Sequence, residues 1–445
     1  MLSARDHYAK CWNFKLDINC RRYSLPDISD ENAVENSSFT RFRKSSEDVL
    51  SKLLNGNGPV NDRPQLPPVV KQHIVMSEND IREFVYSAKD FVWMISYSDY
   101  VFNTEPPPSQ FDLLLQSSWK IATDNNVFRY KLNTLETKVL PGKLGFVAQL
   151  NPQRALERRA PQPFYSMKDP FDPSRFNFTK IKKDEIFFSL NGNGVSKNQD
   201  ETAGDRTTEE AKDFIIANVS PLEYCNILLV PKLHACRPQV VTVDALRLAM
   251  HTLLLSGTWR LRVGFNSLGA MASVNHLHCH AYYLKYNLPT ESLPVEHLAG
   301  PCFVVRQYPA SGFVFQFPPI VRKSESLLEE LDVFISDMYK FICELHQQEI
   351  PHNIFITRGM PLDASVSRKQ LVIRFYIWTR EFCYGAKDSA AFNAALCELS
   401  GHLPVKSEKE FATLTEEEAS KVLMEVSRET FLRAKPLAET MFCLV

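Results

Sequence analysis

Residues 273–284 read SVNHLHCHAYYL, a stretch with an unusual distribution of histidines. His276, His278 and His280 occupy every second position and alternate with a leucine and a cysteine. The composition is typical of a β-strand, on which successive side chains point to opposite faces. We therefore expect the three imidazoles to share one face of a strand, with the intervening leucine and cysteine pointing into a core.

Three interpretations fit such a row of imidazoles. It can be a set of solvent-facing or hydrogen-bonded side chains, although three histidines in alternation make this less favoured than it is for a single histidine. It can be a metal site, since strand histidines two residues apart are common ligands and three ligands suit a catalytic zinc ion. It can also hold a nucleophile, because a neutral imidazole attacks phosphorus and also leaves it readily.

The overall composition is that of a soluble protein. Of 445 residues, 44% are hydrophobic and 23% are charged, and 51 basic side chains against 52 acidic ones give a formal net charge of −1. This balance gives no general reason to expect nucleic acid or an anionic membrane as a partner. No apolar stretch reaches the length of a membrane span.

The cysteines and the N-terminus bear on the compartment. The ten cysteines form no CxxC pair, and several lie in apolar runs, where a free thiol behaves as a small hydrophobic side chain. This pattern favours a reducing compartment over a disulfide framework. The first residues, MLSARDHYAKCWNF, contain no apolar core of a secretory signal. We therefore predict a cytoplasmic protein.

The chain divides into three parts. Residues 1–70 are rich in polar residues, Gly and Pro, and are predicted to be poorly ordered. Residues 71–290 form the predicted catalytic half. A helix is expected to begin near Ser77, and later strand-like runs are interrupted by one helical pattern, VDALRLAMHTLLLSG, and by a long polar loop, NGNGVSKNQDETAGDRTTEE.

Residues 291–445 form the predicted C-terminal half. SESLLEELDVFISDMYKFICELH has one apolar face and predicts an amphipathic helix. Two strands, HNIFIT and LVIRFYIW, and a final helix from about Thr415 to Lys435 are expected after it. The order of helix and then strands repeats that of the preceding half, which suggests two diverged halves and an α+β fold overall.

Several segments together resemble a known family. HLHCHAYY is similar to the histidine-triad signature, and KLGFVAQLN, FNFTKI, NVSPLEYCNILLVP and ALCELSGHLPVK extend the similarity from about residue 90 to about residue 435. The chain thus resembles the GDP-D-glucose phosphorylases, which are related to the plant GDP-L-galactose phosphorylases. The resemblance implies a histidine-triad-like antiparallel sheet with flanking helices.

The resemblance also implies a reaction. Family members split a GDP-hexose with inorganic phosphate, and the middle histidine of the triad, here His278, attacks the α-phosphorus. A guanylyl-histidine forms, which phosphate then cleaves to release GDP. A main-chain carbonyl near His276 is expected to hold the other ring nitrogen of the nucleophile and fix its tautomer. The implied substrates are a GDP-hexose and phosphate, with no metal and no cofactor.

Further residues are candidates for contacts to the nucleotide or its phosphates. Ser273 matches a phosphate-binding serine of the related uridylyltransferases, and arginine and amide side chains suit phosphates, ribose or base edges. Arg158 and Arg159 are interpreted as part of a solvated basic loop. The remaining candidates are Gln149, Asn151, Arg154, Asn177 and Lys180.

The sequence departs from the family pattern at two places. His280 stands where the plant relatives carry glutamine, which makes water a competing acceptor, and Cys225-Asn226 replaces a frequent Gly-His pair. Two other functions therefore stay open beside the phosphorylase. One is a histidine-triad hydrolase that releases GMP, and the other is a non-catalytic nucleotide-binding protein.

Overall fold

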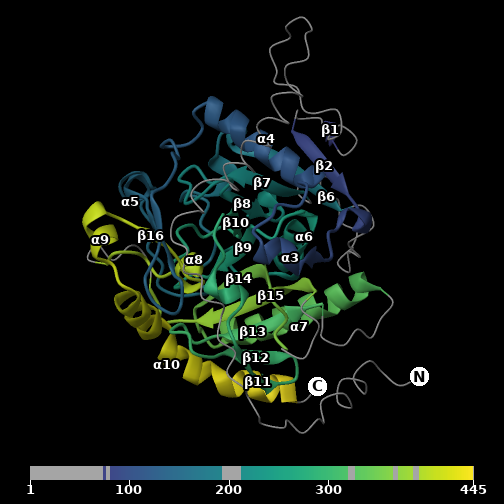
Figure 1. Ribbon diagram of the computed structural model, residues 1–445. Coiled ribbons are helices and arrows are strands. Elements are labelled where there is room, and N and C mark those ends of the chain that lie inside the picture. Colours follow the sequence, from purple (N-terminus) through teal and green to yellow (C-terminus); the bar gives the residue numbers. More distant parts are fainter. Residues whose placement is uncertain are drawn as a thin grey trace, which may run out of the picture.

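The computed structural model describes residues 74–76, 81–192, 212–318, 326–363, 369–383 and 390–443 (Figure 1). The predicted poorly ordered segment 1–70 lies outside these residues, as does most of the predicted polar loop that begins at Asn191.

A large and mostly antiparallel sheet forms the centre of the molecule (Figure 1). Thirteen strands of the described chain belong to it, and the pairing of β2 with β6 is parallel. In spatial order the strands are β1 (Ile74–Met76), β2 (Arg82–Tyr86), β6 (Ile186–Gly192), β7 (Asp213–Ala217), β8 (Ile227–Val230), β10 (Cys279–Tyr283), β9 (Leu261–Asn266), β14 (His352–Gly359), β15 (Gln370–Thr379), β13 (Phe313–Phe317), β12 (Cys302–Val305) and β11 (Val295–Ala299), with β3 (Ile95–Ser96) paired to β15.

The two halves of this sheet have the same connectivity. Strands β6, β7 and β8 are followed by helix α6 (Val243–Leu255) and then by β9 and β10. In the same way, β11, β12 and β13 are followed by α7 (Leu327–Gln347) and then by β14 and β15. In each half the last strand lies between the third and the fourth, and the halves join where β9 pairs with β14. This repetition agrees with the two diverged halves that the sequence suggests.

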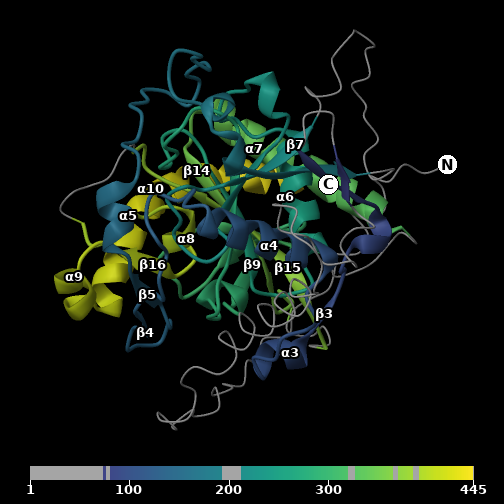
Figure 2. The ribbon, with the colours of Figure 1, turned by 90° about the horizontal axis from the view of Figure 1, so that it is seen from above.

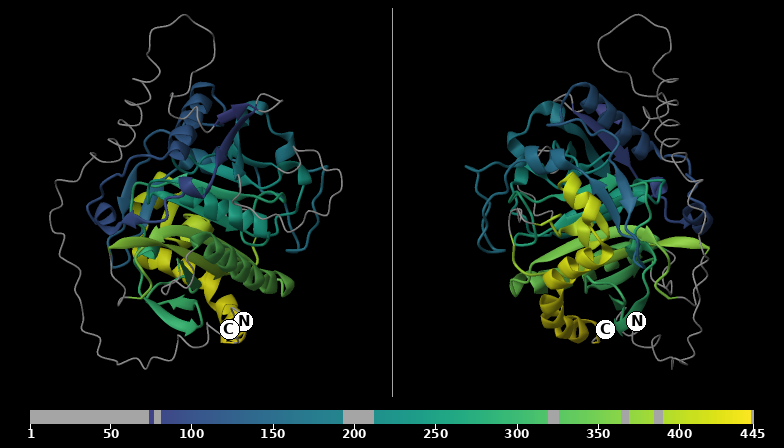
Figure 3. Two further views of the ribbon diagram at one scale, coloured as in Figure 1. Left: turned by 90° about the vertical axis from the view of Figure 1, so that its right-hand side faces the viewer. Right: turned by 60° about the vertical axis from the view of Figure 1, so that its left-hand side comes forward.

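The helices α6 and α7 cover one face of the sheet, as their apolar patterns predict. Thr242 caps α6 by accepting a hydrogen bond from the Ala245 N–H, which satisfies one of the free donors of the first turn. The buried stripe of α7 joins the same core as the helix-facing residues of the strands. Helix α10 (Glu416–Cys443) packs against α7 and the edge strand β11, and Figure 3 shows it beside α7.

The opposite face carries a second core and a small sheet (Figure 2). This sheet pairs β5 (Val147–Leu150) with β4 (Thr137–Val139) and, in parallel, with β16 (His402–Val405), so segments from both halves lie side by side. The other helices are α3 (Tyr97–Val101), α4 (Gln110–Asp124), α5 (Pro152–Glu157), α8 (Leu396–Leu399) and α9 (Glu408–Thr413), and short 3-10 turns include η3 (Phe178–Lys180) and η5 (Leu233–Ala235).

The α+β fold with an antiparallel sheet and flanking helices is confirmed, with corrections in detail. Ser77 lies outside the described residues, and the chain that follows it forms the strand β2 where the sequence predicts a helix. Pairing with β6 decides this, because it places Phe84 and Tyr86 in the core. Among the described residues, no helix combines the length and the apolar composition that a bilayer crossing requires.

The junction of the two halves leaves no room for a side chain at Gly264. A Cβ there would lie 2.7 Å from the Ile354 carbonyl oxygen and 2.8 Å from a methyl carbon of Leu396. We expect Gly264→Ala to lower the free energy of unfolding by about 1–3 kcal/mol because the packed core must shift. Urea denaturation measures this change. Val333→Ala, on the exposed side of α7, serves as the control and should change stability by no more than about 0.5 kcal/mol. Equal stabilities of the two variants would contradict the expectation.

Candidate active site

A polar cavity of about 210 Å³ lies beside the histidine triad. It is formed by α5, the turn before β10, and the segment from residue 393 to residue 406 of the C-terminal half. Four of the residues predicted from the sequence line it, namely Asn151, Arg154, Ser273 and His280. The other lining residues are Ala155, Arg158, Leu222, Asn266, Met271, Asn393, Ala395, Leu396, Cys397, Glu398, Pro404 and Lys406.

His276 is locked by the main chain on both sides of its ring. Its Nδ1 accepts a hydrogen bond of 3.1 Å from the Phe178 N–H, so its proton resides on Nε2, which donates to the carbonyl oxygen of Leu233 at 3.1 Å. Both ring nitrogens are therefore used within the protein. His276 supports the loop ahead of β10 and has no nitrogen left for a ligand.

His278 carries the arrangement expected of a nucleophile. Its Nδ1 donates to the carbonyl oxygen of His276 at 2.7 Å, which leaves Nε2 unprotonated. His278 lies one residue before β10, which begins at Cys279. Its main chain therefore takes no part in the strand pairing of β10 with β8. Instead the side chain of Gln239 accepts from the His278 N–H at 2.8 Å and donates to its carbonyl oxygen at 3.0 Å.

The ring of His278 is buried beside the cavity rather than in its wall. The residue is 2% exposed, and the ring of Phe178 packs edge-on against it at 5.0 Å. The ring centroid of His280 lies 5.1 Å away, and His280 reaches the cavity. The Nδ1 atom of His280 is buried and has no hydrogen-bond partner among the described residues. Such an atom is costly unless a ligand satisfies it.

Burial determines the charge of the three histidines. Removal from water lowers the pKa of His276 to about 4 and that of His278 to about 4, since it penalises the charged imidazolium. The same cause lowers the pKa of His280 well below its ordinary value, with smaller contributions from His278 and Arg154. All three rings are consequently neutral at pH 7, which is the form a nucleophile requires.

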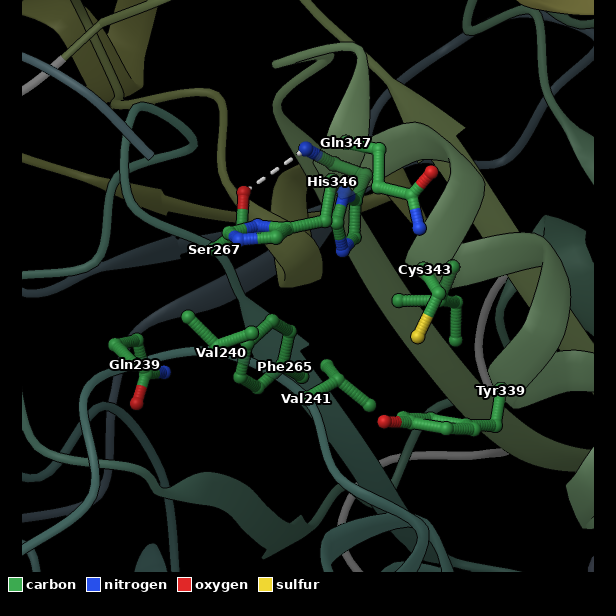
Figure 4. Close-up of a pocket in the computed structure, with 11 residues that line it drawn as sticks. Gln239, Val240, Val241, Phe265, Ser267, Tyr339, Cys343, His346 and Gln347 are labelled. Carbon is green, nitrogen blue, oxygen red and sulfur yellow. Dashed lines mark hydrogen bonds between the residues drawn. The ribbon is translucent and has the colours of Figure 1, made fainter. Parts of the chain in front are cut away.

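Gln239 connects the triad to a second cavity, which Figure 4 shows. This cavity of about 200 Å³ lies between α7 and the segment 239–241, and its wall includes Phe265, Tyr339 and Cys343. No residue that the sequence predicts for the site lines it. The dashed line in Figure 4 is the 3.0 Å hydrogen bond from the His352 N–H to Ser267 Oγ, which holds the start of β14 to the end of β9.

Gln149 lies in a buried polar chain and does not line the cavity. Its amide donates to Glu223 at 2.6 Å and to Thr137 at 3.2 Å, and its carbonyl oxygen accepts from His402 at 2.5 Å. This chain ties the small sheet to the turn before β8. Asn151, which directly follows the end of β5, does line the cavity, and its side chain accepts from the Arg154 N–H to cap α5.

Asn177 and Lys180 also lie apart from the cavity wall. Asn177 caps η3, and the Lys180 ammonium donates to three carbonyl oxygens of residues 173–175. The residue between them that touches the triad is Phe178, through its N–H on His276 and its ring on His278. The FNFTK segment therefore supports the triad through a residue that the polar pattern does not single out.

Several residues that line the cavity are not among the site residues predicted from the sequence. Arg158, expected in a solvated loop, lines the cavity with a buried Nη2 atom that has no partner among the described residues. Asn393, Glu398 and Lys406 reach the cavity from the C-terminal half. The spacing of Arg154 and Arg158 could have indicated that both face the cavity, because residues four apart lie on one side of a helix.

The structure shows that the Cys225-Asn226 pair lies in the turn before β8. Cys225 has a φ of 51°, in the left-handed region where glycine is favoured, so glycine fits this turn in related sequences. Asn226 is fully buried, and its side chain accepts from the Leu222 N–H and donates to the Ala281 carbonyl oxygen. The pair shapes the turn that supports β10 and does not line the cavity.

The arrangement does not suit a shared metal ion. Both nitrogens of His276 are engaged by the main chain, and Nδ1 of His278 is bonded to a carbonyl oxygen. Within the described ranges, no group of three or more His, Cys, Asp or Glu side chains is placed to hold a metal ion. The geometry favours the nucleophile interpretation over the metal interpretation.

Comparison with known proteins identifies the family. The model of the GDPGP1-like N-terminal domain matches residues 110–282, and that of the GDPGP1-like C-terminal domain matches residues 287–437. The chain belongs to the GDPGP1-like family. Its relatives include human GDP-D-glucose phosphorylase 1, 40% identical over 344 residues that cover 76% of this chain and 85% of the human protein.

Further relatives show the breadth of the GDPGP1-like family. The zebrafish (Danio rerio) GDP-D-glucose phosphorylase 1 is 38% identical over 351 residues, covering 77% of this chain and 93% of that protein. GDP-L-galactose phosphorylase 1 of Arabidopsis thaliana is 32% identical over 353 residues, which cover 75% of this chain and 74% of the plant protein. These findings confirm the resemblance that the sequence motifs indicate.

The buried environment of His278 makes a direct prediction about its protonation. Because burial lowers its pKa to about 4, the ring should stay neutral as the pH falls from 8 to 5.5. Nitrogen-15 NMR of histidine-labelled protein, assigned with the His278→Asn variant, measures this titration. An unstructured peptide that contains one histidine is the control in the same buffers, and its imidazole titrates at about 6.5. A midpoint for His278 above 6 would show that the ring is not desolvated.

Proposed function

We propose that this protein is a GDP-D-glucose phosphorylase, which transfers GMP from GDP-glucose to inorganic phosphate. The single observation that carries the proposal is the His278 ring, whose protonated Nδ1 donates to the His276 carbonyl oxygen and whose centroid lies 5.1 Å from that of His280, a residue that lines the polar cavity. The names of the relatives at 37–41% identity supply the substrate class, a GDP-hexose, and the type of reaction.

In the first step, the lone pair of His278 Nε2 forms a bond to the α-phosphorus of GDP-glucose. The bond from that phosphorus to the bridging oxygen breaks, and glucose 1-phosphate leaves with the electron pair. The result is a guanylyl-histidine. His278 Nδ1 keeps its proton and donates it in a hydrogen bond to the His276 carbonyl oxygen, which stabilises the ring as it becomes positively charged.

In the second step, an oxygen of inorganic phosphate bonds to the same phosphorus. The phosphorus–nitrogen bond breaks, GDP forms, and the imidazole recovers its lone pair. His280, with its unsatisfied Nδ1 at the cavity, is the neighbouring group we assign to the phosphate oxygens. Ser273 and Asn151 line the same cavity and are proposed to contact the nucleotide phosphates or ribose.

Water is the alternative acceptor, and one observation favours it. His280 stands at the cavity where plant relatives carry glutamine, so the third triad position is that of a hydrolase. In that case the guanylyl-histidine reacts with water and the product is GMP. The two functions differ only in the molecule that cleaves the intermediate.

We place the reaction in the cytoplasm, with GDP-hexose and phosphate as the partners and no nucleic acid or membrane involved. All eight cysteines in the described part of the chain are free thiols, which is typical of a reducing compartment.

The nucleotide product tests the function. With GDP-glucose and millimolar phosphate, chromatography should show GDP and glucose 1-phosphate in equal amounts, at a rate that depends on phosphate. Other nucleotide sugars in the same assay define the preferred hexose and base. The control is the His297→Asn variant, which changes an exposed histidine on β11. It should form the same products at the same rate as the unmodified protein. If GMP is the product at every phosphate concentration tested, the protein is the hydrolase instead.

A further inference from the structure

Two arginines line the same cavity as His280. Arg154 lies on α5, and Arg158 follows the end of that helix, with its N–H donating to the Arg154 carbonyl oxygen. Both side chains line the cavity together with His280 and Ser273. Arg154 also donates through Nη1 to the carbonyl oxygen of Ser220, so its fork is held in place by the turn before β8.

This placement of the two arginines is electrostatically unfavourable by itself. Two positive charges four residues apart repel each other, and the partial burial of Arg158 weakens its hydration. Burial lowers the pKa of Arg158 first, and the charge of Arg154 lowers it further. The buried Nη2 of Arg158 also lacks a hydrogen-bond partner among the described residues. An unsatisfied buried donor on a charged group costs stability, so the site is built for an acceptor that is not part of the chain.

Glu398 offsets only part of this positive charge. It lines the cavity and favours the charged form of Arg158, but its carboxylate also accepts from the Ala395 N–H at 2.9 Å as the cap of α8. Burial raises its pKa. Lys406 adds a further cation to the same wall. The cavity thus retains an excess of positive charge that suits a doubly charged anion.

We propose that Arg154 and Arg158 form the subsite for the phosphate group that leaves and enters during the reaction. This inference rests on the proposed function. His278 attacks phosphorus opposite the departing group and is displaced opposite the incoming group, so both groups occupy one position. That position receives first the phosphate of glucose 1-phosphate and then inorganic phosphate. A pair of guanidinium forks matches the geometry and charge of such a group.

The subsite also explains how phosphate competes with water. Water is present at a far higher concentration than phosphate, and it carries no charge for the arginine pair to hold. The two cations raise the local concentration and fix the orientation of phosphate, but they do nothing comparable for water. Removal of one arginine therefore shifts the fate of the guanylyl-histidine from phosphorolysis towards hydrolysis.

The ratio of GDP to GMP formed from GDP-glucose at fixed phosphate measures this partition. We expect Arg158→Gln to lower the ratio at least tenfold and to raise the KM for phosphate at least tenfold, while labelled GMP still accumulates on the protein without phosphate. A general structural defect would slow both products and leave their ratio unchanged. Arg159→Gln is the matched control, because Arg159 stacks on the Phe176 ring and does not line the cavity. It should keep the ratio of the unmodified protein.

The outcomes separate the two proposals. An unchanged ratio and an unchanged KM for phosphate in Arg158→Gln, with normal labelling, would overturn the subsite but leave the phosphorylase intact. Absence of labelling and of phosphate-dependent GDP in the unmodified protein would overturn the proposed function, and the subsite with it. If Arg158→Gln does not fold, Arg158→Lys carries the test. Lysine keeps the charge but loses the bidentate contact, so the ratio of GDP to GMP should decrease, though less than in Arg158→Gln. An unchanged ratio would contradict the subsite.

Discussion

A single hydrogen bond, from Nδ1 of His278 to the carbonyl oxygen of His276, fixes the chemistry available to this protein. It selects the tautomer and leaves Nε2 as the reactive nitrogen. The hydrogen bond requires that the main chain of residues 276–278 stays in place. Side chains from outside the strand hold it there. Gln239 holds both main-chain polar groups of His278, and Asn275 in turn accepts from the Gln239 N–H. The nucleophile thus sits ahead of β10, where its backbone is held by side chains rather than by a neighbouring strand.

The repeated fold explains where the rest of the site comes from. In the N-terminal half, His280 lies near the start of the last strand, β10, on the face away from α6 and α7, because Cys279 and Ala281 on the other face belong to the core that these helices cover. On the corresponding strand of the other half, β15, that face carries Tyr376 and Trp378, which are buried in the second core. Arg374 beside them donates to the main-chain carbonyl oxygens of Thr290 and Leu293. The C-terminal half therefore carries no second triad there. It supplies the wall of the cavity, through residues 393–406.

Sequence reasoning captured the features that follow from local periodicity. The helices α6 and α7 and the main strands were predictable, because each depends on the period of apolar side chains within one segment. The expectation that all three histidines lie on a strand is only partly right, because β10 begins at Cys279 and His276 and His278 precede it. The nucleotide contacts were less accessible. Gln149, Asn177 and Lys180 have suitable side chains, but the structure engages them in buried or local hydrogen bonds. Arg158 was assigned to solvent because only the tertiary fold brings residues 393–406 against α5.

The formation of a covalent bond to His278 is the most direct test of the mechanism. Protein mixed with GDP-glucose in the absence of phosphate should gain the mass of one GMP group, and peptide mass spectrometry at alkaline pH should locate it on His278. Addition of phosphate should remove the group as GDP, and the His278→Asn variant should not be labelled and should lose at least about three orders of magnitude in turnover. A GMP group on any other residue, or full turnover by the His278→Asn variant, would contradict the proposed mechanism.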